Sequence, residues 1–295
     1  MTTVKKIKAA NIKEIEDAEI IIDDSFLKTR PLSYSSGKHF RRSPLHYKHY
    51  ITEPRKAPSD AMLIGSATDI IVLQPELFDK KIRVYRKFSK RSNADKERWQ
   101  EMMVEANTNK FTWITEEIHE SAKCCAGALT DNIEARKYID HKGRVQVRID
   151  RVDKEHNIPI VGYLDFEAYD QEVIVDIKTG ADVRPDKHIK QTYGDLEYYL
   201  QWGCYLDHYQ KKYFKFPSFV HINVETTAPY GVSVMVVEPK DEEFGKAEWR
   251  GTLKAFRYCL DNKLFWQSYE FWLFGTRDHY ALRKPGWLKP KTANY

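Results

Sequence analysis

Two apolar runs that each lead into charged residues constrain the fold of this chain more than any other feature. Residues 158–164 run into Asp165, and residues 173–175 run into Asp176 and Lys178. Short runs rich in β-branched residues predict buried strands. Side chains alternate along a strand, so Asp176 and Lys178 share one face, and the isoleucine between them lies on the other. The sequence therefore predicts two neighbouring strands with carboxylates at their edge.

These charges have a chemical and a structural interpretation. If Asp165 comes from the adjacent strand, two carboxylates converge on a hard cation, and Lys178 lies close enough to hold an attacking water or stabilise an oxyanion. That is the chemistry of metal-assisted phosphodiester hydrolysis. The alternative is a surface pair at Asp176 and Lys178, with Asp165 in a turn. The position of these charges at the ends of apolar strands favours a site, because an unpaired charge is costly to bury.

Three segments resemble the core of the PD-(D/E)XK nucleases: Gly162-Tyr-Leu-Asp165, Asp176-Ile-Lys178-Thr179 and Gln201-x-x-x-Tyr205. They resemble in particular the RecE (exonuclease VIII) type of phage and prophage exonuclease. Further segments that resemble this family are Arg42-Ser-Pro44-x-His46-Tyr47-x-x-Tyr50, Gly65-Ser-Ala followed by Gln74-Pro75-Glu-x-Phe78, and Val224-Glu225-x-x-x-Pro229-Tyr230. The resemblance implies an α/β fold with a restriction-endonuclease-like core, in which helices flank a mixed central sheet, and a helical N-terminal part.

The resemblance also implies the roles of individual residues. The catalytic residues that it implies are Asp165, Asp176, Lys178, Gln201 and Tyr205. Asp165 and Asp176 would bind Mg²⁺, or Mn²⁺ in its place, together with the carbonyl of Ile177. Lys178 would orient the attacking water. Gln201 and Tyr205 would approach from one face of a helix, since they lie four residues apart.

Asp69 is the only charged residue in the most apolar segment, residues 61–73. A lone carboxylate in a buried helix requires a partner, a metal ion or a raised pKa. The family has a histidine metal ligand at the position that aligns with Asp69, so this chain departs from the family pattern. An aspartate oxygen also suits Mg²⁺ or Mn²⁺, and Asp69 would take the place of the histidine, as the third carboxylate ligand. The alternative is an aspartate that faces solvent at the edge of the helix.

Two basic segments are candidates for DNA contact. Residues 31–60 interleave basic and aromatic side chains, which suit phosphates and unpaired bases, although a solvated amphipathic helix fits equally well. In the related lambda exonuclease group an arginine and a serine of the early helices hold a 5′-phosphate, and Arg42 and Ser43 are the candidates for this role. Residues 79–110 predict an exposed, charged loop that leads into a helix, and they either line a DNA channel or form a solvated face.

The remaining periodicity predicts one α/β domain over residues 1–295. It divides into a mainly helical part (1–140), a catalytic core (141–265) and an aromatic and basic tail (266–295). The predicted strands are 145–150, 158–166, 173–177, 219–224 and 232–237, and the predicted helices are 61–73, 115–129, 132–139, 187–212 and 241–262.

Composition limits the function classes without selecting one. The 48 basic and 43 acidic residues give a net charge of +5, which suits a nucleic-acid partner but does not establish one. The four cysteines lack zinc or iron–sulfur spacing, and no apolar run approaches the roughly 18 residues of a membrane span, so we expect a cytoplasmic protein with no membrane partner. No phosphate-binding glycine loop and no G-x-S-x-G motif is present.

The resemblance implies a Mg²⁺-dependent exonuclease that degrades linear duplex DNA from the 5′ end, in a bacterium or a phage-infected host. The 3′ tails would pass to a recombinase or a single-strand annealing protein, and the chain would form a homo-oligomer around DNA. Two other functions stay open. One is a PD-(D/E)XK endonuclease or single-strand exonuclease. The other is a DNA-binding protein whose nuclease site is impaired because of Asp69.

Overall fold

A five-stranded mixed sheet lies at the centre of the computed structural model, which describes residues 20–276 apart from residues 55, 90, 171, 270, 273 and 274. The sheet order is β3-β4-β5-β6-β7, and only β5 and β6 are parallel. The bounds are β3 (Gly143–Asp153), β4 (Ile158–Ala168), β5 (Val173–Gly180), β6 (Ser218–Glu225) and β7 (Val232–Val236). All five predicted strands are confirmed.

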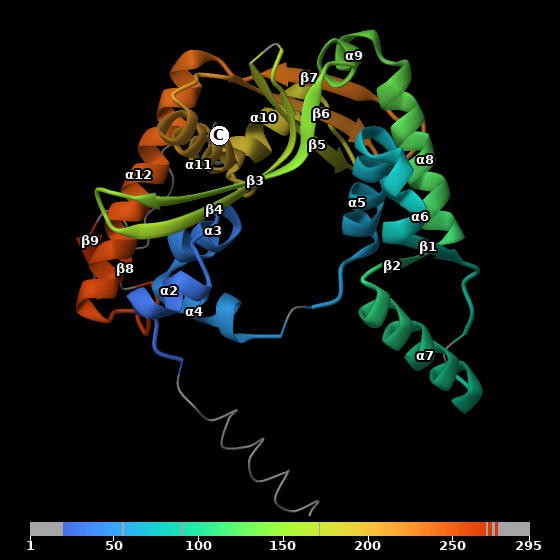
Figure 1. The fold of residues 1–295 in the computed structure, drawn as a ribbon, viewed down its shortest axis with the longest axis horizontal. Coiled ribbons are helices and arrows are strands. Elements are labelled where there is room, and N and C mark those ends of the chain that lie inside the picture. The colour runs from blue at the N-terminus through green and yellow to red at the C-terminus, as the bar shows by residue number, and fades with distance from the viewer. Residues whose placement is uncertain are drawn as a thin grey trace, which may run out of the picture.

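Helices cover both faces of this sheet (Figure 1). On one face, Ile174 of β5 belongs to a hydrophobic cluster with Trp249 of α12. On the other face, Val175 belongs to a second cluster with Leu129 of α8. The alternation along β5 thus supplies both cores, and the predicted fold class is confirmed. The flanking helices are α5 (Asp60–Leu73), α8 (Glu116–Asp131), α9 (Ile133–Ile139), α10 (Pro185–Tyr193), α11 (Tyr198–Tyr213) and α12 (Pro239–Asn262).

The N-terminal helices are part of the first core. Phe40 and Tyr47 place their rings 4.9 and 5.0 Å from the ring of Phe256 in α12. Leu32 forms a β-bridge with Ile160 of β4. The helices concerned are α2 (Asp24–Thr29), α3 (Tyr34–Arg42) and α4 (Pro44–Thr52).

Arg41 of α3 connects these helices to α11 and α12 through its guanidinium group. Its nitrogens lie 3.3 Å from Glu197 and 2.9 Å from Glu248. They also donate to the hydroxyls of Tyr199, at 3.1 Å, and Thr252, at 3.2 Å. A charged side chain that is largely removed from water therefore has four partners at α11 and α12.

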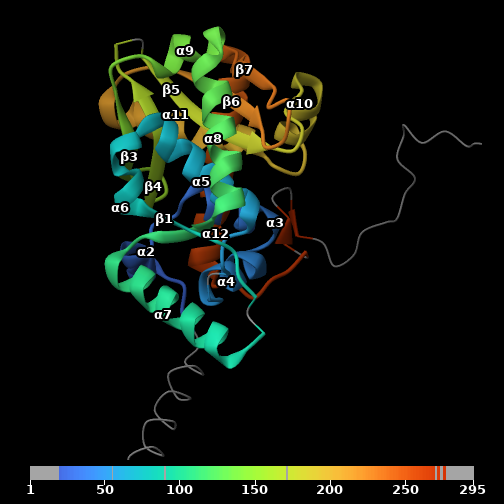
Figure 2. The ribbon, with the colours of Figure 1, turned by 90° about the vertical axis from the view of Figure 1, so that its right-hand side faces the viewer.

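The region of residues 79–110 differs from its prediction as a loop that leads into a helix. The helix is present as α7 (Asn93–Asn109), but β1 (Ile82–Tyr85) precedes it and pairs in parallel with β2 (Thr112–Thr115). Strands of four residues carry too little alternation to be recognised, and the pairing crosses the whole of α7. The short helices η1 (Pro75–Leu77) and α6 (Phe78–Lys81) join α5 to β1. Figure 2 shows α7 below the α5–α8 pair.

The single helix predicted over residues 187–212 is wrong, because the chain forms two helices there. α10 ends at Tyr193 and α11 begins at Tyr198. Gly194 follows α10 directly, and Glu197 has a left-handed φ of 47°, which a continuous helix does not allow. The break allows α11 to lie along the sheet while α10 covers the β6–β7 side of the same face.

Both ends of the described chain reach the first core, through Ile22 and Phe265. A short hairpin forms from β8 (Phe271–Trp272) and β9 (Gly275–Thr276). Most of the predicted tail, and the first nineteen residues of the predicted helical part, lie outside the described residues. In the part of the chain that the structure describes, no single helix is long and apolar enough to cross a membrane; α5 and the η1–α6 segment meet the criterion only together, with a 120° bend between them.

Candidate active site

The candidate site lies where β4 and β5 separate. The two strands pair over three residues each, 166–168 with 173–175, and the next residue pair, Asp165 on β4 and Asp176 on β5, is no longer paired. The β3–β4 ladder is also interrupted opposite Asp165, at Gln146, whose φ of 52° is left-handed. Such a backbone conformation is uncommon for a residue with a side chain and bends the strand. The two predicted carboxylates therefore lie at a fork between two strands.

Asp165 is held in an environment that disfavours its charge. Burial, and next the Asp176 carboxylate, raise the pKa of Asp165 to about 7. The backbone N–H of Ile177 donates to this carboxylate, and Gln146 Nε2 donates to Oδ1 across 3.4 Å. Ile177 thus contributes main-chain atoms at the fork, although the contact seen is its N–H and the predicted role is its carbonyl.

Asp176 is only 2% exposed and has partners on three elements. Gln201 of α11 donates from Nε2 to Oδ1 at 2.7 Å, and Lys178 Nζ lies 2.5 Å from Oδ2. His221 Nε2 lies 3.8 Å from the same Oδ2. Burial alone would lower the pKa of Lys178, but the Asp176 and Asp165 carboxylates raise it above its usual value. Lys178 is therefore a cation at neutral pH, suited to orienting water and not to accepting a proton.

Asp69 reaches the same cluster from α5. Its Oδ1 is buried and has no hydrogen-bond partner among the described residues. Burial, followed by the Asp165 carboxylate, raises the pKa of Asp69 well above its usual value. The helix can approach β5 because Gly65 lies against Thr179, where an added Cβ would be 3.0 Å from the hydroxyl oxygen. The structure thus brings Asp69 to Asp165 and Asp176.

Tyr205, four residues after Gln201 on α11, lies behind the site. Its ring packs on Gly162 of β4, where an added Cβ would lie 3.3 Å from the ring. Burial raises the pKa of Tyr205 well above its usual value, against a smaller opposing effect of a hydrogen bond from Gln201. Tyr205 is therefore placed to support Gln201.

The two predicted DNA contacts, Arg42 and Ser43, lie apart from this cluster in the α3–α4 corner. Arg42 is exposed, with Nη2 3.4 Å from the Tyr269 hydroxyl. Ser43 is 1% exposed, and its hydroxyl caps α4 by accepting from the backbone N–H of His46 at 3.2 Å. The structure gives Ser43 a role within the fold, and its contact with a 5′-phosphate stays a prediction.

The carboxyl groups of the candidate site suit a hard cation by their charge, but they do not stand in the arrangement of a metal centre. Among the described residues, no three or more His, Cys, Asp and Glu side chains stand in the arrangement of a metal centre. However, the buried Oδ1 of Asp69 lacks a hydrogen-bond partner, and the three carboxyl groups of Asp69, Asp165 and Asp176 lie around the ammonium of Lys178, which leaves an excess of negative charge when all are ionised. Burial, and after it the neighbouring carboxylates, raise the pKa values of Asp69 and Asp165. A divalent cation prefers carboxylate oxygens and would relieve this excess.

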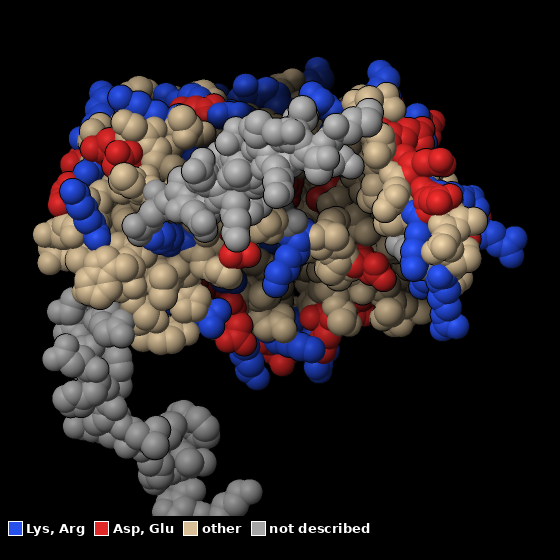
Figure 3. Space-filling model, turned by 90° about the horizontal axis from the view of Figure 1, so that it is seen from below, with Lys and Arg blue, Asp and Glu red and all other residues tan. Residues whose placement is uncertain are grey.

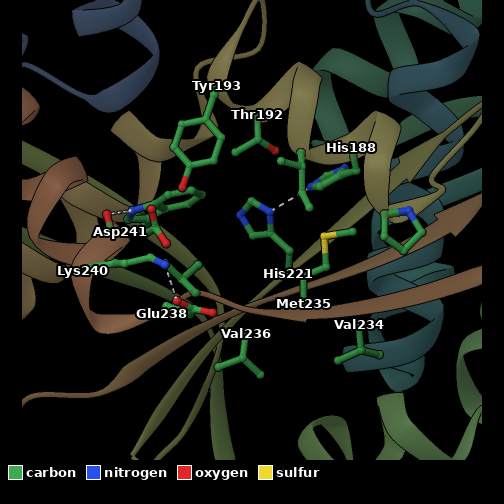
Figure 4. A pocket seen from close by; sticks show the side chains of 14 residues that line it. His188, Thr192, Tyr193, His221, Val234, Met235, Val236, Glu238, Lys240 and Asp241 are labelled. Carbon is green, nitrogen blue, oxygen red and sulfur yellow. Dashed lines mark hydrogen bonds and ion pairs between the residues drawn. The ribbon is translucent and has the colours of Figure 1, made fainter.

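Sequence reasoning missed His221, His188 and Gln146. His221 on β6 lies opposite Asp176 on β5 in the parallel pairing. Its ring contacts His188 of α10 (Figure 4). The signal was the polar residue within the apolar run Val220-His-Ile-Asn-Val224. Burial lowers the pKa of His221 to about 3. Gln146 gave no signal, because a left-handed φ at a glutamine cannot be deduced from residue type.

A forked mixed sheet with Asp165 on one strand, Asp176 and Lys178 on the next and Gln201 on a helix across them defines a PD-(D/E)XK-like protein. The chain belongs to the family described as "PDDEXK-like domain of unknown function (DUF3799)", whose model matches residues 33–267. A search of curated proteins finds no significant match.

One solved structure supports the same fold. The crystal structure of a "putative exonuclease" from Eubacterium rectale matches with a TM-score of 0.53 and 14% identity, over 83% of this chain and 86% of that one. The structure of SSO0001 matches with a TM-score of 0.28 and 11% identity, over 74% of this chain and 90% of that one, which is too low to compare the folds. The family and the residues of the site together support a nuclease.

Proposed function

We propose that this protein is a Mg²⁺-dependent exodeoxyribonuclease of the RecE type, which degrades linear duplex DNA from the 5′ end and leaves 3′ tails. The observation that carries the proposal is the carboxylate pair at the β4–β5 fork, with the Lys178 ammonium 2.5 Å from Asp176. Phosphodiester hydrolysis requires an oriented water and compensation of the charge that develops on the phosphate.

Each residue of the site has a distinct task in this proposal. Asp69, Asp165, Asp176 and the carbonyl of Ile177 would hold Mg²⁺, or Mn²⁺ in its place. The ion, when bound, supplies Lewis-acid compensation of the charge on the phosphate. Lys178 holds the attacking water through its ammonium hydrogens. Gln201 fixes one oxygen of Asp176, and Tyr205 supports Gln201.

Contacts with DNA beyond the scissile phosphate follow from exposed residues and from the family resemblance. Arg42 is the proposed contact for a 5′-phosphate, with Ser43 as its buried neighbour. Figure 3 shows basic and acidic side chains interspersed over the face seen from below, so attraction of DNA depends on individual cations there. By the same resemblance, the chain acts in the cytoplasm as a homo-oligomer and passes its 3′ tails to a single-strand annealing protein.

Digestion of end-labelled DNA tests the proposed function. Wild type is incubated with a linear duplex, with a closed circle and with a single strand, in Mg²⁺, Mn²⁺ or chelator. We expect loss of the linear duplex from its 5′ ends, an intact circle and no reaction in chelator. Lys178→Ala should abolish digestion, whereas Lys123→Ala, which removes a surface lysine paired with Glu120 on α8, should not. Cleavage of the circle would favour an endonuclease, and faster loss of the single strand a single-strand exonuclease.

A DNA-binding protein with an impaired nuclease site is the second candidate. It is favoured by one observation: the Lys178 ammonium already compensates Asp176 in an arrangement that lacks the family histidine. It predicts that linear DNA is bound but stays intact in both metals. Asp69→His would then restore digestion if the missing imidazole is the cause.

A further inference from the structure

The neighbour of Asp176 across the parallel ladder is His221, on the same face of the sheet. His221 is 2% exposed, and its Nε2 lies 3.8 Å from Asp176 Oδ2. Its other nitrogen, Nδ1, lies 3.2 Å from Nε2 of His188, which is 5% exposed on α10 (Figure 4). The three side chains therefore form a buried line that leads from the candidate site to α10.

Electrostatics select one tautomer for this line. Two ring nitrogens at hydrogen-bond distance require that one carries a proton and the other does not. If His188 Nε2–H donates to His221 Nδ1, the proton of His221 is on Nε2 and faces the carboxylate. The reverse arrangement would leave a lone pair of His221 opposite the negative oxygen of Asp176, which is unfavourable in a buried site.

Close packing does not account for the histidine pair. A cavity of about 500 Å³ lies beside it, lined among others by His188, His221, Thr192 and Tyr193. Apolar side chains could occupy this region without desolvating two imidazoles, whose burial is unfavourable unless they are hydrogen-bonded. The pair therefore calls for an explanation from its polar contacts.

We propose that His221, itself held by His188, is a positioning residue that orients the carboxylate of Asp176 electrostatically, with its Nε2–H facing Oδ2. Gln201 holds Oδ1 at 2.7 Å and Lys178 lies 2.5 Å from Oδ2, whereas His221 Nε2 lies 3.8 Å from Oδ2, which is longer than a hydrogen bond. In the proposed reaction, on which this inference rests, Lys178 also has to hold water. His221 is then the group facing Oδ2 that has no other task, and its N–H dipole favours one direction of this oxygen while Lys178 acts.

The test uses the full chain with ¹⁵N-labelled histidine. Long-range ¹H–¹⁵N spectra show which ring nitrogen carries the proton, and His221→Gln and His188→Gln assign the signals by their loss. We expect the His221 proton on Nε2. Calorimetry with Mn²⁺ as probe should show binding weakened about tenfold or more in His221→Phe, the range found for residues that orient metal ligands. The kcat on linear duplex DNA should fall by a similar factor, with an unchanged KM for DNA.

Two variants separate positioning from loss of structure. His221→Gln can place an amide N–H near the original Nε2 and should recover most of the Mn²⁺ affinity. His208→Phe removes another buried histidine of α11. Its Nε2 donates to the carbonyl of Ile149 on β3 at 3.0 Å, and it has no contact with Asp176 among those described. It should leave Mn²⁺ affinity unchanged.

A proton on Nδ1 of His221, or equal Mn²⁺ affinity in wild type and folded His221→Phe, would overturn the inference. Failure of the proposed function has a different signature. Wild type would bind Mn²⁺ and show these effects while every DNA stays intact. A wild-type chain that takes up no Mn²⁺ would overturn the proposed metal site. The position of the His221 proton would then decide alone whether His221 orients Asp176.

Discussion

At the scale of single residues, the carboxylates at the fork store unfavourable charge in the metal-free protein. Burial and the Asp176 carboxylate raise the pKa of Asp165 from 3.8 to about 7. An acid whose folded pKa is raised stabilises the fold fully below its unfolded pKa, and this contribution is lost as the pH rises through the folded value. Metal-free protein should therefore lose stability between about pH 4 and about pH 8.

Asp165→Asn tests this prediction, because the amide does not titrate. In chelator, the Tm of wild type should fall more steeply over this pH range than the Tm of Asp165→Asn. Thermal unfolding followed by circular dichroism provides the measurement. Parallel curves for the two proteins would show that Asp165 is not the group that titrates.

Asp69 should distinguish metal-bound from metal-free protein. A ligand that binds only the folded state raises its stability by mass action, so Mg²⁺ should raise the Tm of wild type at neutral pH. Asp69→Asn should be at least as stable as wild type in chelator, because it removes a buried charge, but it should gain much less from Mg²⁺. Asp140→Asn, on the surface beside Arg136, is the matched control. An equal gain from Mg²⁺ in Asp69→Asn would remove this residue from the metal site.

At the scale of elements, α11 and α12 cross so closely that glycine is required at the contact. A Cβ on Gly203 would lie only 2.0 Å from the carbonyl oxygen of Gly245. Gly203→Ala should therefore lower the free energy of unfolding by about 3 kcal/mol, as overpacked cores do. Gly251→Ala on α12 is the control, since nothing lies within 4 Å of its added Cβ. It should be neutral or stabilising by up to about 1 kcal/mol in urea titrations. Equal effects of the two substitutions would contradict the close crossing.

The elements also show what the sequence can predict. Strands and amphipathic helices were predicted because their periodicity reports burial directly. In α12, for example, the apolar residues Trp249, Leu253 and Phe256 recur at helical spacing and are all buried. The convergence of Asp165, Asp176 and Lys178, which the structure shows, was predicted because charges stood at the ends of apolar runs, and their catalytic roles stay predictions. The break at Gly194 and the β1–β2 pair were missed, because they depend on backbone conformation and on pairing between distant segments. His221 was missed because its position beside Asp176 depends on the pairing of β5 with β6, which the sequence does not show.

At the scale of the whole molecule, Arg41 joins the N-terminal helices to α11 and α12. Arg41→Ala would leave Glu197 and Glu248, whose side chains are 23% and 29% exposed, without their cation. We expect a loss of about 2 kcal/mol, which is less than for a fully buried pair because water reaches both acids. Arg42→Ala on the same helix should change stability by less than about 0.5 kcal/mol.

The same two variants separate stability from DNA contact. Arg42→Ala should weaken binding of 5′-phosphorylated ends more than binding of unphosphorylated ends, whereas Arg41→Ala, where folded, should bind both as wild type does. Urea titration and fluorescence anisotropy provide the two measurements. A loss of stability in Arg42→Ala equal to that in Arg41→Ala would show that the pairing of Arg41 is not specific.

The fork between β4 and β5 has a mechanical consequence. Only three residue pairs join these strands, so backbone hydrogen bonds do not fix the separation of Asp165 and Asp176. Asp165 belongs to the β3–β4 hairpin and Asp176 to the β5–β6 pair, and the two parts of the sheet are joined by the pairing of residues 166–168 with 173–175. A small movement of the β3–β4 hairpin would change the distance between the two carboxylates without breaking the pairing of β5 with β6. We therefore expect the separation of the two carboxylates to vary more easily than the spacing of β5 and β6, which pair over eight residues each.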